Sequence, residues 1–131
     1  SKNGNLHQVP LSKLAIELLQ EIKSHSTESK WLFPSANNSG HFIPEAINKA
    51  VSRNKEKFKD IKHFTPHDLR RTAASHMTAI GIPRLVVSKL LNHVENSVTA
   101  IYDRYSYDKE KRVAIDAWST KLKEIILKNT G

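Results

Sequence analysis

The sequence predicts a mainly helical domain with a small β-hairpin remnant at its amino end, an α+β fold. Most apolar residues recur at the helical spacing of three and four positions, whereas residues 6–9 alternate as in a strand. At 131 residues, with 38% hydrophobic and 26% charged residues, the chain resembles an ordinary globular protein with one core. We therefore expect a single domain over residues 1–131.

The first residues are the part that favours β structure. Residues 1–5 have the composition of a turn, and residues 6–9 run as a short strand into Pro10. A strand that follows a turn needs a partner strand, and no residue precedes this turn. We therefore expect the chain to begin inside a hairpin, as a fragment of a longer protein.

The first half of the chain predicts two helices separated by loops. Ser12 is a suitable N-cap for a helix over about residues 13–24, and Pro44 suits the first turn of a helix that ends near Asn54. Between the two helices, residues 31–33 are apolar, and we expect buried extended chain there. The apolar stripes are Ala15, Leu18, Leu19 and Ile22 in the first helix, and Ala46, Ile47, Ala50 and Val51 in the second.

The stretch after residue 64 predicts two helices joined by a tight turn. Thr65 as N-cap, Pro66 in the first turn and Asp68 have the pattern of a helix start with a capping box. Gly81 ends this helix and Pro83 begins the next. The predicted core positions are Leu69, Ala73, Met77 and Ile80 in the first helix, and Val86, Val87, Leu90 and Leu91 in the second.

The remaining chain predicts one short helix and one long helix. Asn96 or Ser97 can cap the short helix, which carries Tyr102. The long helix covers about residues 108–128, and the residues on its apolar side are Ile115, Trp118, Leu122 and Ile125.

The chain is strongly basic, with a net charge of +8 and a pI near 9.8. Residues 1–64 carry ten Lys/Arg against six Asp/Glu, and residues 65–131 carry eleven against seven, so each half is +4. A folded domain with this balance favours nucleic acid, through phosphate contacts and the release of counterions. A merely soluble basic protein is the alternative.

Cysteine content and hydropathy exclude several classes of protein. The absence of cysteine excludes a disulfide scaffold, a thiol nucleophile and cysteine-ligated zinc. No apolar run approaches the roughly 18 residues that span a membrane, and no signal peptide precedes the first polar residues. We therefore expect a cytoplasmic protein with no membrane partner.

A group of lysines lies between residues 55 and 63. Lys55, Lys57, Lys59 and Lys62 surround two apolar residues, Phe58 and Ile61. The simpler interpretation is a solvated connection that these two apolar residues anchor. The alternative is a patch that faces phosphates.

Four groups between residues 65 and 102 have the chemistry needed to attack a phosphodiester without a metal. Arg70 carries a planar guanidinium that stays ionised and offers parallel donors to phosphate oxygens. His67, on the same side of the helix, and His93 are imidazoles that can donate hydrogen bonds or handle protons. Tyr102 can be a covalent nucleophile, but an ordinary phenol pKa of about 10 requires cationic neighbours or a base. A lysine near the leaving oxygen would complete the set as general acid.

Each of these residues also has a structural interpretation. His67 can bond a neighbouring loop, and Arg70 can pair with a carboxylate. His93 can complement a helix dipole, and Tyr102 can be a core residue with its hydroxyl at the surface. Their combination favours catalysis, in which case all four groups converge on one pocket around a DNA phosphate.

Three motifs carry this combination in a fixed order: Thr65-Pro66-His67-Asp68-Leu69-Arg70-Arg71-Thr72, then Leu91-Asn92-His93, then Tyr102 nine residues later. Together they resemble the signature of the tyrosine recombinases, the phage-type integrase family. Residues 9–12 and 31–35 extend the resemblance upstream. Residues 96–104 and Ala117-Trp118 resemble the integrases of prophages and genomic islands, so the resemblance covers nearly the whole chain.

The resemblance implies a role for each residue. Tyr102 would be the nucleophile that forms a 3′-phosphotyrosyl link, and Arg70 would hold the scissile phosphate with the help of His67 and His93. Lys2 falls at the family's hairpin lysine, which resembles a general acid for the 5′-hydroxyl. No metal or nucleotide cofactor is implied, because the phosphotyrosine stores the bond for religation. The expected DNA contacts are Arg71, Lys55, Lys57 and Lys59.

The same resemblance implies site-specific recombination that integrates or excises a mobile element such as a prophage. The partners would be double-stranded DNA attachment sites, other integrase protomers in a tetramer on DNA, and accessory DNA-bending proteins. The protein would work in the nucleoid of a bacterial cytoplasm. Residues 108–128 could pass to a neighbouring protomer.

Two departures from the family limit this expectation. The family has another essential arginine and DNA-binding domains before the hairpin, and the chain starts too late to include them. We therefore expect a truncated catalytic domain that is weak or inactive alone. Tyr105 and Tyr107 lie close to Tyr102, but the spacing from His93 favours Tyr102 as the nucleophile and packing roles for the other two.

Two other functions fit parts of the pattern. A non-catalytic helix-turn-helix module would read DNA with the helix after Pro83. That helix offers few polar positions, because most of its residues are predicted core. A type IB topoisomerase relative would share the chemistry without recombination, and the phage-like spacing argues against it.

Overall fold

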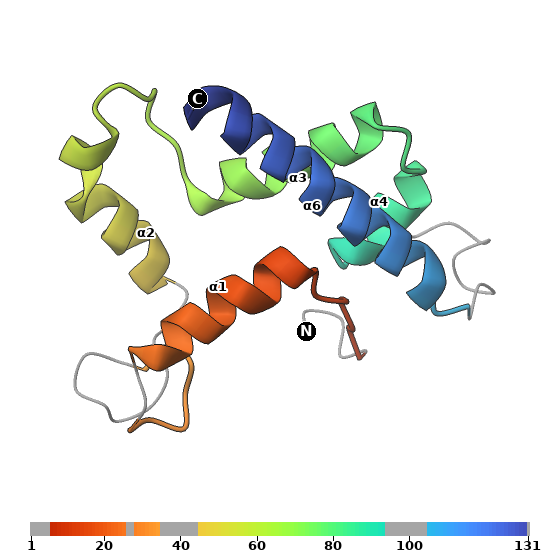
Figure 1. Cartoon of the computed structure of the whole chain (residues 1–131), viewed down its shortest axis with the longest axis horizontal. Helices are drawn as coiled ribbons and strands as arrows, with labels where there is room; N and C mark the ends of the chain where they lie inside the picture. The colour runs from red at the N-terminus through yellow and green to blue at the C-terminus, as the bar shows by residue number, and fades with distance from the viewer. Residues whose placement is uncertain (1–5, 26–27, 35–44, 94–104, 131) are drawn as a thin grey trace. The chain divides into compact units, whose positions relative to one another are not determined.

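The computed structural model describes residues 6–25, 28–34, 45–93 and 105–130, and these residues are mainly helical (Figure 1). The predicted fold class is therefore confirmed for its helical part. Apart from an isolated bridge residue at Pro34, the described residues contain no β structure. The helices are α1 (Lys13–Ser24), α2 (Glu45–Arg53), the 3-10 helix η1 (Lys55–Phe58), α3 (Pro66–Ala79), α4 (Arg84–Leu90) and α6 (Asp108–Thr130).

The strand expected over residues 6–9 is not formed. A strand needs a paired neighbour, and here side chains and main chain of two helices bond the segment instead. His7 Nε2 lies 3.1 Å from the Lys89 carbonyl oxygen, and Lys111 Nζ donates to the Gln8 carbonyl at 2.9 Å. These bonds hold residues 7 and 8 without a β ladder. The residues expected to form the turn of the hairpin lie outside the described part.

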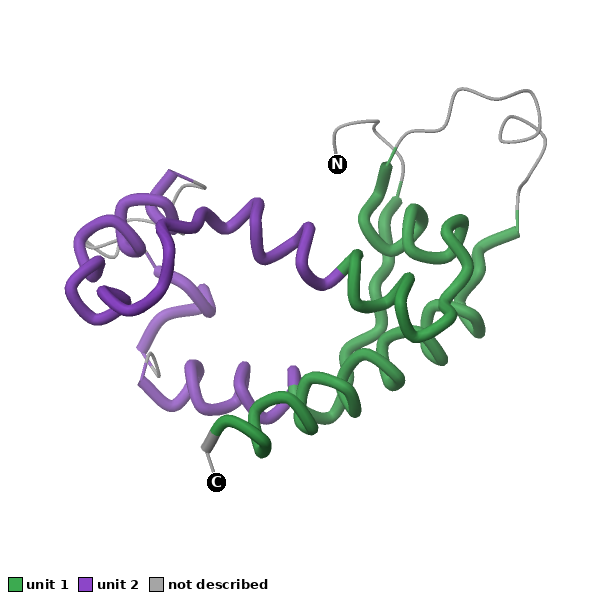
Figure 2. The backbone as a smooth tube through the Cα atoms, turned by 90° about the horizontal axis from the view of Figure 1, so that it is seen from above, with its two compact units in different colours: residues 1–14, 74–131 green, residues 15–73 purple. Residues whose placement is uncertain are grey.

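The chain divides into two compact units (Figure 2). Unit 1 comprises residues 1–14 and 74–131, and unit 2 comprises residues 15–73. Helix α3 contributes its first eight residues to unit 2 and its remaining residues to unit 1. The single domain expected from the sequence stays a prediction.

Unit 1 contains every buried side chain of the described residues. Its hydrophobic core is formed by Met77 of α3, by Ala114 of α6 and by Val86, Val87 and Leu90 of α4. The helical spacing of these residues puts them on facing sides, and α4 packs against α6. His76 stacks on Trp118 at 5.4 Å between ring centroids, which also joins α3 to α6. The core positions predicted after Pro83 are thus confirmed, with Leu91 half-buried.

Unit 2 buries none of its described side chains. Several large apolar residues expected to be covered are instead exposed: Leu18, Trp31, Phe33, Ile47 and Leu69, with Leu69 at 58%. In unit 1 the predicted core residue Ile80 is exposed as well. Residues 31–33 form bends and not extended chain. A short amphipathic helix gains stability mainly from the surface it packs against. In unit 2 the apolar stripes of α1 and α2 are only half-buried at best, so periodicity alone overestimated their burial.

No described helix is both long enough and apolar enough to cross a membrane.

Candidate functional site

The start of α3 is fixed by a reciprocal capping box between Thr65 and Asp68. The Thr65 main-chain N–H donates to Asp68 Oδ2 at 2.9 Å, and the Asp68 N–H lies 3.3 Å from Thr65 Oγ1. The Thr65 hydroxyl also donates to Asp68 Oδ2 at 3.1 Å. These bonds satisfy main-chain donors that a helix start otherwise leaves without partners. The capping box predicted from the sequence is therefore confirmed.

The same bonds keep Asp68 ionised. The hydrogen bonds from the Thr65 main chain and hydroxyl lower the pKa of Asp68, and the nearby charges of Arg71 and His67 lower it further. Arg71 Nη1 lies 3.8 Å from Asp68 Oδ1, but both side chains are largely exposed, so this ion pair adds little stability. The main role of the Asp68 carboxylate is therefore to cap α3, and its ion pair with Arg71 is secondary.

His67 and Arg70 lie on the first two turns of α3 and are both exposed. Their spacing of three residues places them on the same side of the helix. The partial positive charge at the N-terminal end of α3 favours an anion, and the Asp68 carboxylate of the cap already lies there. A guanidinium and an imidazole side by side suit a phosphate group.

His93 is held by the turn that ends α4. The His93 N–H donates to the Ser88 carbonyl at 3.0 Å, and the Asn92 N–H donates to the Lys89 carbonyl at 3.3 Å. This pair of bonds is a Schellman motif, which ends a helix and requires a left-handed backbone conformation at the position that Asn92 occupies. Asn92 does so, with φ of 57°. The motif fixes the main chain of His93, whose side chain is exposed.

The end of α3 uses the same motif. The Ile82 N–H donates to the Met77 carbonyl at 3.0 Å, and the Gly81 N–H donates to the Thr78 carbonyl at 3.1 Å. Gly81 has φ of 96°, a conformation in which a glycine costs nothing sterically. The predicted helix end at Gly81 and the start of the next helix after Pro83 are thus confirmed.

The expected convergence of the four groups stays a prediction. His67 and Arg70 belong to unit 2, and His93 belongs to unit 1. Lys2 and Tyr102 lie outside the described residues, as does the short helix expected to begin at Asn96 or Ser97.

Tyr105 is poorly suited to be a nucleophile. Its hydroxyl donates to Glu110 Oε1 at 2.9 Å. This hydrogen bond, followed by burial and the negative charge of Glu110, raises the pKa of Tyr105. A raised pKa disfavours the phenolate that would attack phosphorus. The Tyr105 ring packs against the Tyr107 ring, with 4.7 Å between the ring centroids. Lys89 Nζ lies 5.4 Å from the centroid of the Tyr107 ring. Both tyrosines therefore have the packing contacts expected of them.

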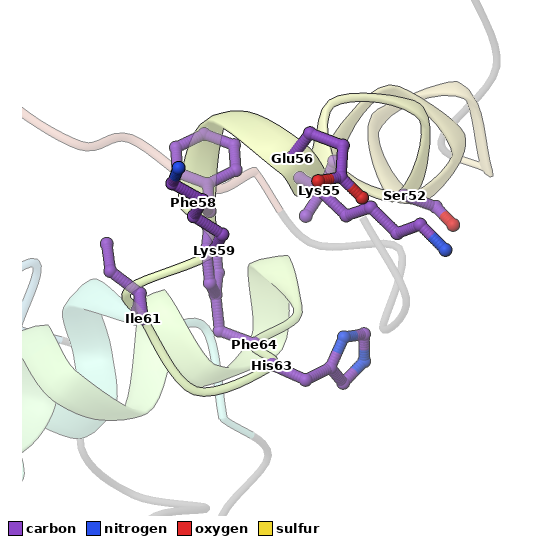
Figure 3. A pocket seen from close by; sticks show the side chains of 9 residues that line it. Ser52, Lys55, Glu56, Phe58, Lys59, Ile61, His63 and Phe64 are labelled. Atoms are coloured by element: carbon purple, nitrogen blue, oxygen red, sulfur yellow. The ribbon is translucent and has the colours of Figure 1, made fainter.

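The predicted lysine patch lies on and beside η1, and Lys55, Lys57 and Lys59 are all exposed. Phe58 and Phe64 anchor this region through an edge-to-face contact at 5.3 Å between ring centroids. They line a cavity of about 340 Å³ together with Lys55, Glu56 and Lys59. In Figure 3 the side chains of Lys55 and Lys59 extend in different directions from it. Phe58 was expected to anchor this region, whereas the contribution of Phe64 was not predicted, and Ile61, the other expected anchor, is 58% exposed.

The described residues contain no group of three or more His, Asp or Glu side chains that could hold a metal ion.

Comparison with known proteins adds independent information. Residues 1–109 match the model of the phage integrase family. The chain is 35% identical over 107 residues to tyrosine recombinase XerD of Rhizobium meliloti, an alignment that covers 77% of the chain and 34% of that protein. It is 31% identical over 129 residues to tyrosine recombinase XerA of Pyrococcus horikoshii, covering 96% of the chain and 44% of that protein.

A third relative is tyrosine recombinase XerC of Pelobacter propionicus, which is 30% identical over 112 residues. That alignment covers 82% of the chain and 36% of the relative. The chain therefore spans less than half the length of the curated relatives it matches. No solved structure matches the chain significantly.

Proposed function

The chain belongs to the phage integrase family of tyrosine recombinases, and on that premise we propose that the protein it represents breaks and rejoins DNA at specific sites. The observation that carries the proposal is the start of α3. The Thr65–Asp68 capping box holds a helix N-terminus on which His67 and Arg70 are exposed together. This arrangement supports binding of a phosphodiester.

In the proposed reaction, the Tyr102 hydroxyl oxygen attacks the scissile phosphorus. A new bond forms between the tyrosine oxygen and phosphorus as the bond from phosphorus to the 5′-oxygen breaks. His93 or His67 assists removal of the phenol proton, and Lys2 gives a proton to the departing 5′-oxygen. Attack of a 5′-hydroxyl on the phosphotyrosine reverses these steps and rejoins a strand.

Arg70 would stabilise the negative charge that grows on the non-bridging oxygens. Its guanidinium can donate two parallel hydrogen bonds to a phosphate and stays ionised throughout. Stabilisation of developing charge by fixed donors usually lowers the barrier of such reactions more than any other effect. The reaction as written transfers the phosphoryl group between oxygens and needs no cofactor.

Arg71, Lys55, Lys57 and Lys59 would hold the DNA backbone. All four side chains are exposed. Contacts of this kind carry no sequence information, so they would raise affinity and make it depend on salt. The partners we propose are double-stranded attachment sites, further protomers in a tetramer and accessory DNA-bending proteins. The reaction would integrate or excise a mobile element in the bacterial nucleoid.

The rival helix-turn-helix function receives no support from α4. A recognition helix must expose side chains that can reach base edges. Of the seven residues of α4, only Arg84 and Leu85 are exposed, because Val86, Val87 and Leu90 are core. This leaves too few polar positions to read a sequence.

Trapping of a covalent complex tests the proposed function. The full-length protein would be incubated with a nicked attachment site that loses its 5′ fragment after cleavage, and then run on a denaturing gel. The wild type is expected to form a covalent complex, and Tyr102→Phe to bind the site without forming one. Residues 1–131 alone are expected to form little or none. A wild-type protein that binds the site and never becomes covalently attached would contradict the proposal.

A further inference from the structure

Two neighbouring cavities of unit 2 form one seam between α2 and the chain that leads into α3, here called the α2–α3 seam. The first is the cavity of about 340 Å³ in Figure 3, and the second has a volume of about 450 Å³. The residues that line both cavities are Val51, Ser52, His63 and Phe64. The second cavity also reaches Thr65 and Pro66, where α3 begins. The seam therefore ends beside the first turn of α3.

Two aromatic rings line the first cavity. The rings of Phe58 and Phe64 meet at an interplanar angle of 81°, with 5.3 Å between their centroids. Rings at nearly a right angle form a corner, in which a third flat ring can stack on one face and meet the edge of the other. Phe58 is 36% exposed and Phe64 is half-buried, so part of this ring surface is accessible. A flat aromatic ligand suits such a corner.

The charge along the seam is mainly positive. Lys55 and Lys59 line the first cavity, Lys49 lines the second, and all three side chains are exposed. Among the described residues that line the two cavities, Glu56 is the one carboxylate. The seam therefore favours a ligand that combines a flat ring with negative charge.

A nucleotide has both features, a flat base and an anionic phosphate. In a duplex the faces of the bases are covered by their neighbours, so a duplex offers only phosphates and base edges. A base face can reach the two rings only when the base is unstacked. A basic groove with aromatic side chains is the arrangement by which many proteins bind single-stranded nucleic acid. The seam thus fits unpaired DNA better than duplex DNA.

We propose that the α2–α3 seam binds unpaired DNA, with one base in the corner of the two phenylalanine rings and the neighbouring phosphates on the three lysines. This inference rests on the proposed function and deepens it. A strand that rejoins to another duplex must first leave its own partner strand, so unpaired nucleotides arise next to the cut. The seam adjoins the helix start that carries His67 and Arg70, and all of these residues belong to unit 2. It is placed to hold such nucleotides.

Two single strands of equal charge separate base stacking from phosphate contacts. One is an oligothymidine of about twelve nucleotides, a length within the site sizes of such grooves. The other has the same length and the same phosphates, but an abasic deoxyribose at every position. The affinity of the full-length protein for each strand would be measured by fluorescence anisotropy at one fixed salt concentration, because phosphate contacts depend on salt.

We expect Phe64→Leu to weaken binding of the thymidine strand by at least about fivefold, because leucine stays apolar but cannot stack on a base. Binding of the abasic strand should stay within about twofold of wild type, because it depends on phosphate contacts alone. Phe33→Leu is the matched control and should change neither affinity. Phe33 is an exposed phenylalanine of the same unit that lines neither cavity.

Lys55→Ala should weaken binding of both strands by the same factor, because it removes a phosphate contact and no ring. An equal loss on both strands in Phe64→Leu overturns the proposal. No loss on either strand overturns it as well, and the cavity would then suit an acidic protein segment instead.

A cross-link in the wild-type protein gives an answer that does not depend on any variant. Folding of each variant is checked by a cooperative thermal melt, and if Phe64→Leu does not fold, the cross-link decides. A 5-iodouracil base in the single strand forms a covalent bond on irradiation with an aromatic side chain on which it stacks. Mass spectrometry of the digested complex should find the adduct on Phe58 or Phe64. Adducts found only at other residues, or none, overturn the proposal.

The proposed function and this inference fail in different ways. A wild-type protein that binds its attachment site but never becomes covalently attached would reject the proposed function. Normal covalent trapping, with no preference for the thymidine strand over the abasic strand, would reject only the binding of an unpaired base in the α2–α3 seam.

Discussion

Asp68 Oδ2 accepts the Thr65 main-chain N–H at 2.9 Å, while the Asp68 N–H points back to the Thr65 hydroxyl at 3.3 Å. The two residues thus cap the N-terminus of α3 reciprocally, with an aspartate in the place where glutamate is more common. Because this cap fixes the residue at which α3 begins, it also places His67 and Arg70 in the first two turns of the helix.

Removing the cap should loosen α3. Thr65→Ala is expected to destabilise the protein by about 1 kcal/mol, because the Asp68 N–H loses its side-chain acceptor and the Asp68 carboxylate loses the hydroxyl donor. Chemical denaturation followed by circular dichroism measures this. Thr120→Ala is a matched control, since the Thr120 hydroxyl bonds only within α6, to the Asp116 carbonyl at 3.1 Å. Equal effects of the two substitutions would contradict the role given to the cap.

The lowered pKa of Asp68 predicts a specific acid sensitivity. The unfolded chain takes up the proton at the ordinary aspartate value of about 3.9, whereas the folded chain resists it. The stabilisation is therefore complete above about pH 4 and is lost as the pH falls through the folded pKa. Thermal melts at decreasing pH should show a steeper loss for wild type than for Asp68→Asn. Asp60→Asn, at an exposed position, should retain the wild-type slope.

The left-handed residues at the ends of α3 and α4 should respond differently to a Cβ. Asn92→Ala is expected to cost about 1 kcal/mol, and Asn92→Gly to be neutral or slightly stabilising, because φ is 57° there. Gly81→Ala is a pure test of backbone strain, since an added Cβ would meet nothing within 4 Å. Its expected cost is also about 1 kcal/mol. The midpoints of denaturant unfolding measure these differences in stability. An Asn92→Ala variant as stable as Asn92→Gly would contradict the left-handed conformation assigned to residue 92.

Arg70 and Arg71 are adjacent, but their substitution should have different consequences. Arg70→Lys is expected to lower the cleavage rate by about 100-fold with little change in binding, because lysine cannot donate two parallel bonds to the phosphate. Arg71→Ala should instead weaken binding slightly and reduce the salt slope by about one phosphate contact. Rate and affinity measured across a salt series separate the two. A similar rate loss in both variants would count against the role of Arg70.

The lysine patch predicts a salt-dependent contribution to binding. Replacing Lys55, Lys57 and Lys59 together by alanine should reduce the slope of log affinity against log salt by about 2 to 3. The control is the same triple replacement on α6, at Lys121, Lys123 and Lys128, which should change the slope little. Equal slopes for the two triple variants would show that the patch does not contact phosphates.

Local chemistry made several elements predictable. The bounds of α1 coincide with the expected residues 13–24, and the capping box and the Gly81 turn are formed as expected. Each depends on residues within a few positions of one another, so a local pattern contains the necessary information. The Schellman motif at Asn92 also depends only on nearby residues, but asparagine indicates a left-handed helix end less strongly than glycine does.

Other features depend on contacts between distant segments. Residues 6–9 alternate like a strand, but a strand also requires a partner, and the bonds from His7 and to Gln8 come from helices more than 80 positions away. Lys111 looks like an ordinary surface charge in the sequence, because nothing local indicates that the Gln8 carbonyl will accept its hydrogen bond. The exposure of Leu69 has the same origin, since helical periodicity marks a face but not whether another element covers it.

The most direct test of the account is to identify the residue that carries DNA. After trapping on a nicked site and nuclease digestion, trypsin cleavage at Lys89 and Arg104 would separate Tyr102, in residues 90–104, from Tyr105 and Tyr107, in residues 105–109. Mass spectrometry should find the nucleotide adduct on the first peptide, at Tyr102. An adduct on the second peptide, or a covalent complex that persists in Tyr102→Phe, would contradict the central claim.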